Sequence, residues 1–86
     1  MENVLVVYKT DANHTYASRN MIGIASDDHN AQMICKERAY KEGNNIIGDA
    51  WDTLVTLNQT QGYQGEGEFQ IEEIPLDTHL KEKPIQ

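Results

Sequence analysis

The fold is decided by residues 19–28, Arg-Asn-Met-Ile-Gly-Ile-Ala-Ser-Asp-Asp, where the sequence pattern changes from that of a β-strand to that of an α-helix. Two isoleucines two positions apart share one face, which predicts a β-strand over residues 19–25. Gly23 within it marks a bulge or a close backbone approach. Ser26 or Asp27 can then cap a helix, because an oxygen there accepts a hydrogen bond from an orphan N–H of the first turn. We therefore expect a strand that passes directly into a helix.

The helix is expected over residues 27–42. Apolar residues recur there at helical spacing and form the stripe that would be buried, namely Ala31, Ile34, Cys35 and Ala39. Basic residues lie in the later turns, where positive charge suits the helix dipole, and Gly43 follows as a stop. This segment carries the helical layer of the predicted fold.

Two further strands flank this unit. Residues 3–9 are apolar on both alternating faces, with Val4, Val6 and Tyr8 on one side and Leu5 and Val7 on the other, as in a central strand. The polar connection 10–18 would join it to strand 19–25 as an antiparallel hairpin. In residues 68–74, Phe69 and Ile71 alternate with Glu68, Gln70 and Glu72, so the three polar residues are expected on a solvated face until Pro75 ends the strand.

Residues 46–61 are ambiguous. Asp49 can cap a short helix, whereas the β-branched run 53–57 equally suits a strand. We expect a short turn or helix at 49–53 followed by an extended segment, and the choice between strand and helix for 53–59 stays open. Trp51 and Tyr63 flank this region and are either core residues or interface residues.

These segments predict a two-layer α+β fold. An antiparallel sheet of three to four strands, in the order β-β-α-(β)-β, would carry one main helix on one face. We expect a single domain over residues 1–75 and a loosely ordered C-terminal tail over 76–86. The face of the sheet away from the helix would need cover from segment 46–57, from the tail or from a second copy of the chain.

The charge is strongly acidic and uneven. The 86 residues carry 7 Lys and Arg against 14 Asp and Glu, a net charge of −7. Residues 49–80 hold 7 acids and no Lys or Arg. Nucleic-acid binding needs a basic footprint, so neither a nucleic acid nor an anionic membrane is an expected partner. The N-terminus lacks a signal-peptide pattern and no apolar run is long enough to span a membrane, which favours the cytoplasm.

Cys35 is the only cysteine and lies on the apolar stripe of the expected helix. It therefore forms no internal disulfide or cysteine-based zinc site, and we expect a core residue rather than a nucleophile. Adjacent helical acids such as Asp27 and Asp28 do not converge on one ion. We accordingly expect no metal and no cofactor.

The polar connection supplies the candidate ligand-binding residues. Asp11, His14, Tyr16 and Arg19 offer an acid, a base and an anion-binding guanidinium on one loop. Their spacing matches no catalytic motif, and such residues also serve turns and solubility, so the structural role is favoured and no catalytic residue is assigned.

The acidic half supplies the candidate interface residues, which are Trp51, Tyr63, Glu66 and Glu68. The leading hypothesis is a small, acidic, non-catalytic protein-interaction or regulatory module that is steered to a basic patch on a partner and can form a homodimer. One alternative is a small-ligand-binding protein or minor enzyme that uses the 11–19 loop. A further alternative is an acidic inhibitor that mimics DNA.

The sequence also resembles a group of short bacterial proteins of unknown function. The likeness rests on Tyr8-Lys9-Thr10-Asp11, on His14 with Tyr16, Ser18 and Arg19, on Ile22-Gly23-Ile24-Ala25, on Gln59-Thr60-Gln61-Gly62-Tyr63, and on Gly65-Glu66-Gly67-Glu68-Phe69. It covers most of residues 3–74. The resemblance implies a strand hairpin, a packed helix and a closing strand, and it carries no activity, cofactor or catalytic residue.

Overall fold

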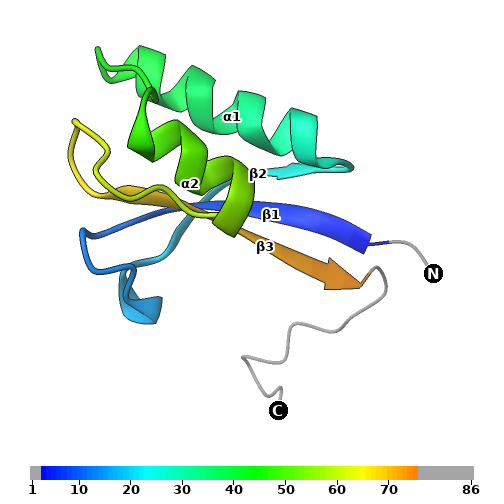
Figure 1. Ribbon diagram of the computed structural model, residues 1–86. Coiled ribbons are helices and arrows are strands. Elements are labelled where there is room, and N and C mark those ends of the chain that lie inside the picture. The colour runs from blue at the N-terminus through cyan, green and yellow to red at the C-terminus, as the bar shows by residue number, and fades with distance from the viewer. Residues whose placement is uncertain (1–2, 76–86) are drawn as a thin grey trace.

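A computed structural model describes residues 3–75 of the chain (Figure 1). The elements in chain order are β1 (Asn3–Thr10), a 3₁₀ turn η1 (Tyr16–Ser18), β2 (Asn20–Ala25), α1 (Asp28–Lys41), α2 (Asp49–Leu57) and β3 (Glu68–Pro75). The predicted α+β class is confirmed. The tail expected over residues 76–86 lies outside the described residues.

The three strands form one antiparallel sheet in the order β2-β1-β3, so β1 is the central strand. Val7 lies opposite Gly23 on one side and Ile71 on the other. The β1–β2 register shifts just after Val7, which marks a bulge in the hairpin. A Cβ at Gly23 would lie 3.0 Å from the side chain of Ile34, so this glycine also lets α1 approach the sheet closely.

The expected helix is α1, which starts one residue later than predicted and ends one residue earlier. Asp27 is its N-cap, and its carboxylate accepts the N–H of Asn30 at 2.8 Å. Ala31, Cys35 and Ala39 of the predicted stripe are buried, and Ile34 packs against them partly buried. The local cap and the helical spacing were therefore sufficient to place this element.

The segment 46–61 differs from expectation. Residues 49–57 form one helix, α2, and only Gln59 makes an isolated bridge, to Gln70 of β3. The short helix followed by an extended run at 53–57 is therefore wrong. Leu54 gains complete burial in the helical form, and the threonine hydroxyls bond back to carbonyls one turn earlier, so tertiary packing overrides the β-branched composition.

Both helices cover the same face of the sheet (Figure 1). The core lies between the helices and the sheet. The sheet contributes Leu5, Val7, Phe69 and Ile71, and the helices contribute Ala31, Cys35, Ala39, Ala50 and Leu54. Ala25, Ile46 and Tyr63 complete the cluster. Neither α1 nor α2 covers the opposite face (Figure 1). We call this surface the open face; its exposed apolar and aromatic residues are Tyr16, Met21 and Ile24.

The loop before β3 depends on a glycine at residue 67. Gly67 has φ +75°, and a Cβ there would lie 2.1 Å from the carbonyl oxygen of Thr10. Gly62 in the same loop has φ +82° with open space around it. Both glycines have the left-handed backbone conformation, but only at Gly67 would an added Cβ clash with a neighbouring atom.

We expect Gly67→Ala to destabilise the fold more than Gly62→Ala. Left-handed strain costs an alanine about 1 kcal/mol at either site, and the clash with Thr10 adds about 1–3 kcal/mol at residue 67. Urea denaturation of the two variants measures this difference. Equal losses would show that the close approach to Thr10 is not a constraint.

Candidate functional site

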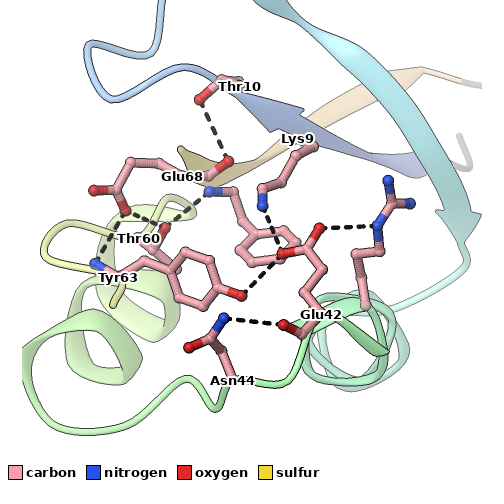
Figure 2. A network of polar contacts seen from close by, with 9 residues as sticks. Lys9, Thr10, Glu42, Asn44, Thr60, Tyr63 and Glu68 are labelled. Atoms are coloured by element: carbon pink, nitrogen blue, oxygen red, sulfur yellow. Dashed lines mark hydrogen bonds and ion pairs between the residues drawn. The ribbon is translucent and has the colours of Figure 1, made fainter. Parts of the chain in front are cut away.

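Glu68 lies inside the protein at the start of β3. Its carboxylate accepts the hydroxyl of Thr60 at 2.6 Å and the N–H of Tyr63 at 3.4 Å (Figure 2). It also accepts the N–H of Gly62 at 3.2 Å. The Thr60 hydroxyl in turn accepts the N–H of Phe69 at 2.8 Å. The expectation that Glu68 faces solvent is wrong, because the glycine-containing loop folds over it and supplies these donors. Glu68 therefore holds the loop to β3.

A second carboxylate, that of Glu42 at the end of α1, gathers three donors. Lys9 Nζ lies at 2.9 Å, the Tyr63 hydroxyl at 3.1 Å and Arg38 Nε at 3.1 Å (Figure 2). Partial burial alone would raise the pKa of Glu42, but the hydrogen bonds from Lys9 and Tyr63 and the charge of Lys9 hold it below its usual value. Glu42 therefore joins α1, β1 and the loop before β3.

Tyr63 connects the two carboxylates, because its N–H reaches Glu68 and its hydroxyl reaches Glu42. Its ring packs edge-on against Phe69 with centroids 5.1 Å apart. Burial raises the pKa of Tyr63 to about 12, and the bond to Glu42 adds to the shift. Tyr63 is thus a core residue.

The four candidate interface residues lie in different environments. Tyr63 and Glu68 are buried, Trp51 is half-buried with Lys36 Nζ 4.3 Å from its ring centroid, and Glu66 is exposed. They do not form one surface. The periodicity of the sequence could not show this, because the burial of Tyr63 and Glu68 depends on how the loop closes.

A hollow of about 570 Å³ opens beside this network. Its lining residues are Lys9, Thr10, Asp11, Ala12, Ser18, Asn20, Glu42, Glu66 and Gly67. Of the four candidate loop residues, only Asp11 lines it. His14, Tyr16 and Arg19 lie elsewhere, so the acid, base and guanidinium do not converge on this hollow.

Asp11 and His14 shape the β1–β2 connection. The Asp11 carboxylate accepts the N–H groups of Asn13 and Thr15 and the hydroxyl of Thr15, and these bonds, the backbone one from Thr15 first, lower its pKa. His14 Nε2 lies 2.8 Å from the carbonyl oxygen of Thr60. Since a carbonyl only accepts, this nitrogen is the donor. His14 therefore ties the connection to the segment beside β3.

Tyr16 and Arg19 do come together, on the open face. The guanidinium carbon of Arg19 lies 4.8 Å from the ring centroids of both Tyr8 and Tyr16. Arg19 Nη1 donates to Glu72 at 3.0 Å, and the Tyr8 hydroxyl donates to the same oxygen at 3.3 Å. Burial raises the pKa of Tyr8, and the charge of Glu72 raises it further.

Tyr8 and Glu72 were not among the predicted site residues. They lie on the same face of neighbouring strands, but their adjacency depends on the β1–β3 register, which no local pattern shows. Beside them, the buried atoms Arg19 Nε and Gln70 Oε1 have no hydrogen-bond partner within the described residues.

Cys35 and the acids offer no reactive or metal-binding cluster within residues 3–75. Burial raises the pKa of the Cys35 thiol to about 12, so the thiolate needed for nucleophilic attack is scarce at neutral pH. No group of three or more His, Cys, Asp or Glu side chains in this range could hold a metal ion.

Comparison with other proteins adds no activity. No protein family, curated protein or solved structure matches this chain. No helix described in residues 3–75 has the length and apolar character needed to cross a membrane.

The burial of Tyr63 predicts a loss of stability at high pH. Between about pH 10 and 12 the folded protein keeps a proton that an unfolded tyrosine has released, so the free energy of unfolding falls as the pH rises through this window. We expect Tyr63→Phe to cost about 1 kcal/mol at neutral pH, through the lost bond to Glu42, and to flatten this alkaline decline.

Denaturation in urea from neutral to alkaline pH measures both effects. Tyr40→Phe is the matched control, because Tyr40 is 77% exposed. If the free energy of unfolding of Tyr63→Phe fell with rising pH as steeply as that of the wild type and of Tyr40→Phe, the alkaline loss of stability would not be due to Tyr63.

Proposed function

We propose that this protein is a non-catalytic protein-interaction module that binds its partner through the open face. The proposal rests on the exposure of large side chains next to Arg19, whose guanidinium is held in place by neighbouring side chains. Tyr16 is 76% exposed, Ile24 60% and Met21 53%. Tyrosine, methionine and arginine are the residue types enriched at protein interfaces.

The Arg19 group is organised before binding. Two tyrosine rings and the Glu72 carboxylate restrict the guanidinium, so little side-chain entropy remains to be lost when a partner binds. The buried atoms Arg19 Nε and Gln70 Oε1 lie beneath this surface, so the contacts with a partner would come from the exposed side chains around them. The open face thus combines exposed apolar side chains with a guanidinium that is already held in place.

The net charge of −7 favours a partner with a basic surface. An excess of acid raises the encounter rate with such a partner, and salt screens this steering. We place the interaction in the cytoplasm, where a free thiol such as that of Cys35 stays reduced.

The two alternative functions have less support from the geometry. A ligand-binding or catalytic 11–19 loop needs its ionisable groups around one pocket, whereas His14 bonds Thr60 and Arg19 bonds Glu72. A DNA mimic needs its acids on the surface, whereas Glu68 is buried and Glu72 is in an ion pair.

The sharpest test is a pair of tyrosine variants. Partners are captured on the immobilised protein from its native cells, identified by mass spectrometry, purified and titrated individually. We expect Tyr16→Ala to weaken binding about 5- to 30-fold, as the loss of an interface anchor does. Tyr40→Ala, with 77% exposure on α1, is the matched control and should bind normally.

Salt provides the second readout of this test. Binding of the basic partner should weaken as ionic strength rises, because its steering is screened. The proposal would be refuted if the immobilised protein captured no basic protein. It would also be refuted if Tyr16→Ala and Tyr40→Ala bound the partner equally well.

A further inference from the structure

The outer edge of β2 is an unpaired strand edge within the described residues. β2 lies at one side of the sheet and pairs only with β1. Its sequence, Asn-Met-Ile-Gly-Ile-Ala, contains no charged residue and no proline. Exposed sheet edges normally carry such residues, because they discourage pairing with another chain. This edge therefore lacks the usual protection.

The backbone groups of Ile24 point to that outer edge. Ile71 on β3 donates its N–H to the carbonyl of Asn58, so its backbone groups point away from β1. Val7 lies opposite Ile71, and its groups consequently point toward β2. Because successive residues of a strand point their backbone groups to opposite sides, the N–H and C=O of Val6 point toward β3. Ile24 lies opposite Val6, so its own N–H and C=O point away from β1, to the outer edge of the sheet.

The other side of the sheet is protected. Segment 58–60 bonds the outer side of β3 at Phe69 and Ile71, with N···O distances of 3.0 and 2.7 Å. Glu72 and Glu73 then add negative charge, and Pro75 ends the strand without an N–H. Pairing with another chain is therefore directed to β2.

A groove between β2 and α1 runs beside the outer edge of β2. It has a volume of about 360 Å³ and is lined by Ile22, Ile34, Glu37, Arg38, Lys41 and Glu42. Two of these residues are apolar, two are acidic and two are basic. Arg38 and Glu42 pair with each other, so Glu37 of one groove and Lys41 of an identical groove are the charges that can meet under two-fold symmetry, in a chain that is otherwise strongly acidic.

We propose that β2 pairs antiparallel with β2 of a second copy, which joins the two sheets into one six-stranded sheet. Antiparallel pairing of a strand with itself obeys two-fold symmetry, and neither strand brings a charge into the contact. Ile24 of each copy donates and accepts the new backbone hydrogen bonds. This contact uses the edge of the sheet and does not depend on the open-face partner.

Amide hydrogen exchange on the full chain tests the pairing directly. Over about a hundredfold range of concentration, with sedimentation measured in parallel, the Ile24 amide should become at least about tenfold more protected as the dimer forms. Salt should strengthen the dimer, because it screens repulsion between two chains of charge −7, whereas it weakens binding to a basic partner.

Ile24→Pro removes the outward N–H without removing a β1–β2 hydrogen bond, and Ile24→Val keeps it as the matched control. We expect the proline variant to dimerise at least about tenfold more weakly and the valine variant to dimerise normally. Tyr16→Ala, which tests the open face, should leave the dimer intact, so the two proposals can fail separately.

A chain that stays monomeric, an Ile24 amide protected equally at every concentration, or a dimer that survives Ile24→Pro would overturn the proposal. Equal protection would mean that the edge is covered within one chain. If Ile24→Pro fails to fold, the concentration dependence of the wild-type Ile24 amide decides the question.

Discussion

The burial of one apolar layer between the sheet and both helices is the constraint on which the rest of the structure depends. β1 occupies the centre of the sheet and contributes Leu5 and Val7, while β3 contributes Phe69 and Ile71. Each such side chain stabilises the fold by about 1.5–3 kcal/mol when fully buried. Because two short helices can cover only one side, the other side of the sheet stays open.

The polar network at one end of the sheet completes this core. There the helices give way to a glycine-containing loop, and Tyr63 and Lys9 cover Phe69 in their place. The Lys9 ammonium is partly removed from water, so it needs the Glu42 carboxylate, and the buried Glu68 needs its Thr60 and backbone donors. The need to satisfy these charges explains why a cluster of polar side chains lies at this end of the core.

The two uncovered parts of the sheet differ in chemistry. The open face presents an arginine held between tyrosines, with exposed apolar residues beside it. The edge of β2 presents neutral backbone next to a groove of mixed charge. A chain of net charge −7 would approach a basic protein readily and its own copy only where charge is absent or balanced. This difference in charge is the reason why the two proposals assign different partners to the two surfaces.

Helix α1 and its cap could be predicted from the sequence, because the oxygen of Asp27 and the spacing of Ala31, Cys35 and Ala39 act over a few residues. The three strands and the α+β class followed from the same kind of short-range pattern. The rest required tertiary contacts. α2 extends to Leu57 because Leu54 is buried against distant residues, and Glu68 turns inward because the preceding loop supplies its donors. The grouping of Arg19 with Glu72 joins residues 53 positions apart, through a strand register that only the folded sheet determines.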